Sequence, residues 1–467
     1  MSKKTAKQIL PFVLLAAVAI IAMFIKPQAD FVPPADGPQY NSADIAWVLV
    51  STALVFLMTP GLAFFYGGMV NRKNVISTMI KSVVAAGIVG VLWVVCGFSL
   101  AFGESVNGLI GNPSTYAFYD GVKSGAAWPL ANTIPLGLFS LFQLMFAIIT
   151  PGLVVGAVAE RIKFTAYVLF IVLFSLLVYA PVAHWSWHPE GFLAKMGAWD
   201  FAGGTVVHIT AGCAALAGAM VLKRRKSHIE NKEIPPANVP YVLIGTGLLW
   251  FGWFGFNAGS AVGATPLAVN AFATTTTAAS SAGLAWMFFD VIKGKKPSVL
   301  AFCIGAVVGL VAITPAAGYV GISQSIIIGL VGAIASNIAV SIKQRSKLDD
   351  TLDVFPCHGI GGMVGMLMTG LFANTNAHGI PGGPQGLFYG NPEFFFTQLK
   401  AMAIVAGYSF GVSYLIFKFI SVILPLRVTE QEEEMGLDES QHNEKYSQGT
   451  LLVHHTNGEV KETTVKH

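Results

Sequence analysis

The sequence predicts an all-α membrane protein with eleven core transmembrane helices, arranged as two inverted five-helix repeats plus a final helix. Of the 467 residues, 54% are hydrophobic and only 11% are charged, a balance far outside that of soluble domains. Apolar segments long enough to cross a bilayer follow one another along most of the chain, without the short alternating strands of a membrane barrel. Lys and Arg residues gather in every second connection between these segments.

The N-terminal region is expected to lie outside the helical core. Residues 1–29 contain an apolar run, Ile9–Ile25, after three lysines, which is typical of a signal peptide or of an additional N-terminal membrane anchor. The run is short for a spanning helix, yet no small-x-small cleavage site follows it, so both alternatives stay open and a retained anchor is slightly favoured. Residues 30–43 are proline-rich and read as an extracytoplasmic linker.

The membrane domain is predicted at 44–426. Its apolar segments fall at roughly 44–69, 77–101, 134–158, 164–183, 205–222, 241–260, 267–292, 299–316, 319–342, 358–372 and 398–424. Residues 427–467 form a polar tail.

The distribution of basic residues predicts the orientation of these helices. Clusters occur at Arg72–Lys73, Arg161–Lys163, Lys223–Lys226, Lys293–Lys296 and Lys343–Lys347. Connections rich in Lys and Arg remain on the cytoplasmic side. The clusters and the tail after Arg427 are therefore expected to be cytoplasmic, in a multi-pass protein of the cell membrane.

Two histidines lie in matching contexts within apolar segments. His208 follows Asp200 in a stretch suited to a helix that starts at an acidic N-cap, and His358 follows Asp353, with Pro356 suited to a first helical turn. A single buried histidine is most often a satisfied core residue, but two polar rings in a membrane are costly and mark a functional path. We expect the two rings to lie within hydrogen-bonding reach at mid-membrane, mostly neutral and able to relay a proton.

The histidine-bearing segments are the fifth and the tenth, and this odd offset of five segments has a consequence for the topology. Segments one to five and six to ten form two repeats, and an odd count makes the second an inverted copy of the first. His208 and His358 then occupy equivalent places, and the substrate path lies between the repeats. Small residues such as Ala211, Ala215, Gly361 and Gly365 allow close helix packing, although this spacing is common in membrane helices.

Aromatic and small polar residues gather at the expected outer ends of several helices, in Phe142–Phe146, Trp185–Trp187 and Trp253–Ser260. Aromatic faces attract a cation as it loses water, although an interfacial aromatic belt is the simpler explanation for any one tryptophan. The apolar segments carry no carboxylate well inside them, and a bare cation is costly to bury. The path therefore favours a substrate that is a cation in water and a small neutral base after losing a proton, such as ammonium and ammonia, with methylammonium as an analogue.

Other classes of function find little support. The four cysteines, Cys96, Cys213, Cys303 and Cys357, match no zinc or disulfide framework. We predict no metal and no cofactor. The sequence has no nucleic-acid-binding pattern and no nucleophile with a placed base, so an enzyme is not expected.

These motifs resemble those of the ammonium transporter family, which comprises the Amt, Mep and Rh proteins. The resemblance covers about Asp44–Tyr446 and rests on Asp200–His208, Gly252–Ser260, Asp353–Gly362 and Gly156–Arg161. It implies a homotrimer with one pore per subunit. It also implies site roles, namely recruitment by Phe146, Trp187 and Ser260, a gate of Phe146 and Phe256, twin pore histidines His208 and His358, and Asp200 as a deprotonating or structural acid.

The resemblance is to the Amt branch, because Trp187 and Ser260 match its outer site; Trp185 is a rival for the role of Trp187. The tail resembles the family's cytoplasmic regulatory segment, which implies a PII-type signal protein as a partner, while its composition alone indicates a solvated acidic tail. We expect the acidic run Glu430–Glu434 to dock on basic loops such as Lys343–Lys347. An Rh-like gas channel and an ammonium sensor signalling through the tail are the alternatives.

Overall fold

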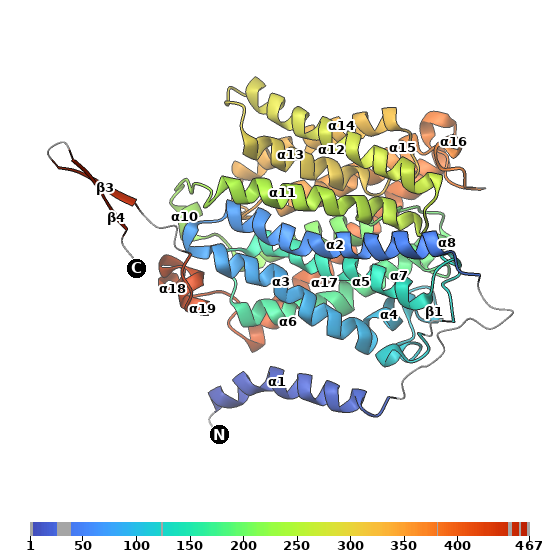
Figure 1. Cartoon of the computed structure of the whole chain (residues 1–467), viewed down its shortest axis with the longest axis horizontal. Coiled ribbons are helices and arrows are strands. Elements are labelled where there is room, and N and C mark those ends of the chain that lie inside the picture. Colours follow the sequence, from blue (N-terminus) through green and yellow to red (C-terminus); the bar gives the residue numbers. More distant parts are fainter. Residues whose placement is uncertain are drawn as a thin grey trace.

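The computed structural model describes residues 3–25, 39–122, 125–380, 382–446, 451–456 and 459–464. Residues 30–38 of the predicted linker lie outside these ranges, so the linker prediction is tested only at its end. The protein is a bundle of long, roughly parallel and antiparallel helices (Figure 1), which confirms the predicted all-α class.

Within the described residues, eleven helical segments form the bundle, in the places that the apolar segments predicted. In chain order they are α2 (Ser42–Met69); α3 (Val75–Leu92) with η2 (Trp93–Gly97) and α4 (Phe98–Phe102); α5 (Leu136–Val158); α6 (Phe164–Phe174) with η4 (Ser175–Tyr179) and α7 (Ala180–Trp187); η5 (Gly204–Ile209) with α9 (Thr210–Leu222); α11 (Val239–Trp253) with η6 (Phe254–Ala258); α12 (Pro266–Ile292); α13 (Val299–Ile313); α14 (Ile322–Gln344); η8 (Phe355–Ile360) with α15 (Gly361–Phe372); and α17 (Pro392–Ile423).

Short elements connect these segments. They are η1 (Arg72–Asn74), η3 (Ala117–Tyr119), α8 (Phe192–Lys195), α10 (Lys226–Ile229), η7 (Gly259–Ala261), α16 (Thr375–His378) and η9 (Leu387–Tyr389), with a small antiparallel pair β1 (Ser105–Val106) and β2 (Ile110–Gly111). The tail contains α18 (Glu430–Met435), α19 (Leu437–His442) and an antiparallel hairpin of β3 (Leu451–Thr456) and β4 (Glu459–Thr464).

Nine helices of the described chain are long and apolar enough to cross a membrane. The other two bundle segments are α12, which is long but carries the polar run Thr274–Thr277, and α13, which has only 15 residues. Each threonine of that run donates its hydroxyl to a carbonyl three or four residues earlier. These bonds satisfy the polar groups within the helix itself, so α12 remains compatible with an apolar surrounding.

Five bundle segments of the described chain contain a π-helical turn, η2, η4, η5, η6 and η8. Such turns interrupt the regular helical hydrogen bonding and often occur at functional sites. The turn η5 carries His208, η8 carries His358 and η6 carries Phe256. Three of the residues singled out in the sequence therefore lie on local irregularities of otherwise regular helices.

One end of the bundle collects the basic connections, and we call it the basic end. Figure 1 shows α10, α18 and α19 there, with α8 and α16 at the opposite end. Glu160 is central to this end, because its carboxylate accepts from the Asn71 backbone N–H at 2.7 Å and pairs with Arg225 at 2.6 Å. Arg161 is fully buried and donates to Thr351 Oγ1 at 2.6 Å. These charges tie four connections of the bundle together.

The acidic tail docks on the basic end through partners other than the expected ones. Lys73 Nζ donates to the Glu433 carbonyl at 2.8 Å, Lys163 lies 3.8 Å from Glu432, and Lys226 pairs with Glu434. The expected contact with Lys343–Lys347 is wrong for Lys343. That side chain instead pairs with Asp353 at 2.6 Å and donates to the Asp350 carbonyl at 2.8 Å, because these acceptors lie in its own connection.

The N-terminal helix α1 (Lys3–Ala22) exposes large apolar side chains such as Phe12 and Ile20. Its apolar part, Ile9–Ala22, is shorter than the spanning helices of the bundle. This is the behaviour expected of either a membrane anchor or a signal peptide, and both remain predictions.

Candidate functional site

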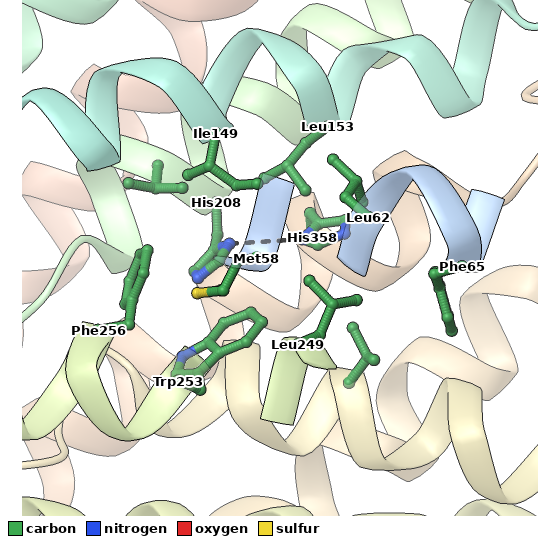
Figure 2. A pocket seen from close by; sticks show the side chains of 12 residues that line it. Met58, Leu62, Phe65, Ile149, Leu153, His208, Leu249, Trp253, Phe256 and His358 are labelled. Carbon is green, nitrogen blue, oxygen red and sulfur yellow. Dashed lines mark hydrogen bonds between the residues drawn. The ribbon is translucent and has the colours of Figure 1, made fainter. Parts of the chain in front are cut away.

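An apolar pocket lies in the middle of the bundle, and the two histidines are its polar lining. The lining residues come from α2, α5, η5, α11, η6, α13 and η8, and they are Met58, Leu62, Phe65, Ile149, Leu153, Val207, His208, Leu249, Trp253, Phe256, Val307 and His358. Figure 2 shows Phe256 and Phe65 at opposite ends of this pocket, with the histidines between them. The pocket is therefore elongated and apolar, with two imidazoles between its ends.

The two imidazole rings face each other through the same type of nitrogen. His358 Nδ1 and His208 Nδ1 lie 3.4 Å apart, and the rings are inclined by 25°. A hydrogen bond between two Nδ1 atoms requires that one of them carries the proton and the other does not. The two rings therefore cannot both be imidazolium ions in this arrangement. The two histidines thus lie within hydrogen-bonding reach of each other, as expected. The other ring nitrogen of His208, Nε2, has no hydrogen-bond partner within the described residues.

An acidic side chain caps each histidine-bearing helix. Asp200 accepts from the backbone N–H groups of Gly203, Gly204 and Thr205 at 2.9, 2.7 and 2.7 Å, and from the Thr205 hydroxyl. A carboxylate suits this place because the first N–H groups of a helix have no partner within the helix. The Asp200 oxygens are thus used in holding η5, eight residues before His208.

The acid that caps the second helix is Asp350 and not Asp353, the acid singled out before His358 in the sequence. Asp350 accepts from the backbone N–H groups of Val354 and Phe355 at 3.0 and 2.7 Å, and it precedes His358 by eight residues, as Asp200 precedes His208. Asp353 has a left-handed backbone (φ 57°), and its carboxylate is directed to Lys343. Burial raises the pKa of Asp350 to about 6, so its carboxylate form still predominates at neutral pH.

Two glycines bring the histidine-bearing helices into backbone contact. A Cβ atom on Gly212 would lie 2.2 Å from the Gly359 nitrogen, and one on Gly362 would lie 3.1 Å from the His208 Cβ. Each glycine stands four residues after the histidine of its own helix, and each packs beside the histidine of the other. This reciprocal contact is what an inverted repeat produces, and it fixes the separation of the two rings.

An aromatic cluster closes the pocket at the end away from the basic loops. Phe146 packs on Phe256 with ring centroids 4.3 Å apart, and on Trp187 with centroids 5.8 Å apart in an edge-to-face arrangement. Phe256 in turn lies over His208 at 6.0 Å. Both phenylalanines are buried. Passage from this end therefore requires that at least one of the two rings turns aside.

The structure distinguishes the two neighbouring tryptophans. Trp187 contacts Phe146 and donates its indole N–H to the Asp200 carbonyl at 3.0 Å. Trp185 instead donates to the Leu109 carbonyl and packs on Phe192 and Tyr408. Trp187 is the tryptophan beside the pocket entrance.

Ser260 lies one turn beyond Phe256, in η7. Its hydroxyl donates to the Phe256 carbonyl at 2.8 Å. The hydroxyl hydrogen is used in this bond, so the oxygen lone pairs remain as acceptors for an N–H donor.

Most of the apolar pocket lining was not singled out in the sequence. Met58, Leu62, Ile149, Leu153 and Val307 lie in segments that are apolar on every side, so no periodicity marks them. The inverted repeat could have located their helices, because the lining comes from the first, third and fifth segments and from their counterparts, the sixth, eighth and tenth.

Comparison with known proteins agrees with the resemblance found in the sequence. Residues 46–446 match the Ammonium Transporter Family. The chain is 44% identical to the ammonium transporter Amt1 of Archaeoglobus fulgidus over 404 residues, which cover 86% of this chain and 99% of the relative. Its fold is similar to that of Mep2 from Candida albicans, with a TM-score of 0.79, 36% identity and coverage of 84% and 88% of the two chains.

A solved structure described as a sensor Amt protein is also similar. Its TM-score is 0.78 at 29% identity, covering 86% of this chain and 98% of that one. The family match spans the whole bundle, including both histidine helices and the docked part of the tail. This chain is a member of the ammonium transporter family.

Proposed function

We propose that this protein transports ammonium across a cell membrane, by recruiting the cation at the aromatic cluster and conducting ammonia past the two histidines with a proton relay. The observation that carries the proposal is the facing pair of Nδ1 atoms, 3.4 Å apart, in a pocket that is otherwise apolar. Membership of the family supports the substrate, and so does the similarity to the ammonium transporter Amt1.

Recruitment uses Phe146, Trp187 and Ser260. The exposed edge of the aromatic cluster attracts a cation by about 0.5–2 kcal/mol as water leaves, and Ser260 offers a lone pair to an ammonium N–H. Sodium and potassium ions have no N–H to donate. They lose more coordination to water than they regain here, so the entrance selects ammonium.

Deprotonation follows from the character of the pocket beyond Phe256. A bare monovalent cation is costly to transfer into a wall of aliphatic and aromatic side chains, whereas neutral ammonia is not. Phe146 and Phe256 act as the gate, since their contact separates the entrance from the pocket. Within the pocket, the polar groups that can carry the released proton are His208 and His358.

The role of Asp200 in this proposal is structural. Its carboxylate already accepts four hydrogen bonds from residues 203–205. These bonds hold η5 and therefore His208, and the Asp200 carbonyl orients Trp187.

Electrical recording from the purified protein in liposomes tests the proposal. An ammonium gradient should produce a saturable current, and a potassium gradient should not. A sensor is the second candidate, favoured by the similarity to a sensor Amt protein. Ammonium binding without current or ammonia flux would support the sensor and contradict transport.

Trp187→Leu should raise the ammonium concentration at which transport is half-saturated, without lowering the maximal rate of transport. Loss of one aromatic face removes about 0.5–2 kcal/mol of cation attraction, which raises the half-saturating ammonium concentration by roughly two- to thirtyfold. Current is measured over a range of ammonium concentrations. Trp185→Leu is the matched control and should behave as wild type, because Trp185 faces Phe192 and Tyr408; a shift in that variant alone would reverse the assignment.

The tail is proposed to be cytoplasmic and regulatory, coupling the subunits of a homotrimer and offering a docking place for a PII-type protein. Its contacts with the basic end support this role. The Asp438 carboxylate accepts from the Ser77 backbone N–H at 2.7 Å, and the Asn74 side chain accepts from the Leu437 N–H at 2.8 Å. The tail thus caps the start of α3 without reaching the pocket.

Deletion of residues 429–467 should lower transport by roughly two- to fivefold and leave the trimer intact. The reason is that the docking pairs are mostly exposed or half-buried, and each such pair contributes about 0.2–1 kcal/mol. Flux in liposomes and the mass of the purified complex are measured together. Deletion of only residues 447–467 retains α18 and α19 and is the control; an inert or monomeric product of the longer deletion would show that the tail is needed for assembly.

A further inference from the structure

The His208 ring is held by its surroundings more than by its own hydrogen bond. Within the described residues its polar partner is His358, at a distance of 3.4 Å, and its Nε2 has none. Ordinary N–H donor bonds are about 2.9–3.0 Å long. A single long bond leaves the ring free to turn unless a neighbouring surface fixes its plane.

Trp253 supplies that surface. Its indole lies nearly parallel to the His208 ring, with centroids 5.4 Å apart and an inclination of 18°. Figure 2 shows Trp253 beside His208 on one side of the pocket, with Met58 next to both. Trp253 also packs on Phe256 at 5.3 Å, so one side chain borders both the gate and the relay.

The indole is itself held by a directed hydrogen bond. Trp253 Nε1–H donates to Thr314 Oγ1 at 2.9 Å, and the Thr314 hydroxyl donates to the Leu310 carbonyl at 2.7 Å. The threonine hydrogen is committed to Leu310, so its lone pair must face the indole. Both side chains are buried, which leaves no water to replace the bond.

Thr314 is a rigid anchor because the next residue packs on the start of the His208 helix. A Cβ atom on Gly204 would lie 2.6 Å from the Pro315 ring, and the Phe201 N–H donates to the Pro315 carbonyl at 3.2 Å. The segment 314–315 therefore holds η5 from one side and the indole from the other.

We propose that Trp253 is a positioning residue whose tether to Thr314 fixes the plane of His208, so that Nδ1 meets His358 and the pocket stays too narrow for a hydrated ion. This inference rests on the proposed function only for its effect on transport. The orientation of the ring can be measured without transport.

Two substitutions remove the tether, and Thr314→Val also keeps the size of the side chain. Trp253→Phe retains an aromatic ring without an N–H, and Thr314→Val retains the shape of threonine without an acceptor. In protein labelled with ¹⁵N at its histidines and held in lipid, each variant should lose the coupled Nδ1 signals of the histidine pair, assigned by their absence in His208→Ala. Thr314→Ser restores the acceptor and should restore these signals.

The same variants should raise the potassium-to-ammonium permeability ratio roughly tenfold, since the loss of one buried hydrogen bond changes an equilibrium by about that factor. Thr369→Val is the matched control, because the Thr369 hydroxyl donates to the Gly365 carbonyl at 2.8 Å and Thr369 is not part of the pocket lining. Trp286→Phe, in a separate apolar cluster, is the control for tryptophan.

The readouts separate this inference from the proposed function. Unchanged histidine signals in both Trp253→Phe and Thr314→Val overturn the positioning role, whatever the currents. Altered signals in a protein whose wild type carries no ammonium flux support the positioning role and contradict the transport proposal. If Trp253→Phe does not fold, Thr314→Val with Thr314→Ser decides the question alone.

Discussion

His208→Ala and His358→Ala should each abolish the selective ammonium current, with a loss of roughly a hundredfold. Positioned groups that transfer protons typically contribute about 10²–10⁴-fold to a rate, and each substitution removes one of the two nitrogens that face each other at 3.4 Å. Each also removes the volume of an imidazole from the pocket. We therefore expect the remaining flux to be uncoupled ammonia, with potassium entering where it did not before.

The measurement is ammonium and potassium current in liposomes, beside the alkalinisation that ammonia entry causes inside them. His228→Ala is the control, since His228 lies at the basic end and contacts Arg224. His208→Asp is the companion variant: a fixed carboxylate in place of the imidazole should pass cations, potassium included. Wild-type current and selectivity in both alanine variants would falsify the histidine relay.

Asp200→Asn should lower transport at least as much as the two histidine substitutions do. The reason is structural. The carboxylate accepts from three backbone N–H groups and one hydroxyl, and an amide places an NH₂ group against some of these donors. A buried donor without an acceptor costs about 1–3 kcal/mol, so the loss of two such bonds amounts to about 2–6 kcal/mol. We expect little folded protein or a transporter that is nearly inactive.

Asp350→Asn provides the comparison, because Asp350 caps η8 with two backbone N–H bonds. If both acids are caps, both variants should lower the melting temperature of the detergent-solubilised protein. If Asp200 instead accepts the proton of ammonium, Asp200→Asn should stay as stable as wild type and lose only transport. Asp353→Asn should have the smallest effect of the three, since it removes only a pair with Lys343.

The helices of the bundle could be predicted from the sequence, and the irregularities within them could not. The expected segment 205–222 is observed as Gly204–Leu222. The expected segment 398–424 is observed as Pro392–Ile423, which begins six residues earlier and ends one residue earlier. Hydropathy gives the length of an apolar segment, but a π-helical turn has the same composition as an α-helical one. The turns that carry His208, Phe256 and His358 were therefore not predicted.

The cap at Asp350 was missed for a similar reason. In the sequence, Asp353 is the acid that stands shortly before Pro356, a residue suited to a first helical turn. The left-handed backbone at Asp353 and its pairing with Lys343 come from tertiary packing. A signal was present nonetheless: the spacing of eight residues from Asp200 to His208 recurs between Asp350 and His358. A comparison of the two repeats, position by position, would have found it.

Trp187 shows where a resemblance goes further than composition. Composition could place Trp185 and Trp187 only in an aromatic belt, and their proximity in sequence left a choice. The two side chains point in different directions along α7, so only Trp187 meets Phe146. The aliphatic lining at Leu62, Leu153 and Val307 could be inferred from neither source, because a membrane helix offers the same residues to lipid and to a pore.

The backbone contact of the two histidine helices bears on the speed of transport. Gly212 packs against Gly359, and Gly362 packs against His208. Rocking of one half of the protein against the other would have to break these backbone contacts, so under the proposed function we expect transport without a rearrangement of the whole bundle. The motion that remains is rotation of the gate rings. Rotation of these two buried rings is a local motion, whereas domain movements take microseconds to milliseconds. Under the proposed function, we therefore expect the throughput to be limited by proton transfer and by rotation of the gate rings rather than by a domain movement.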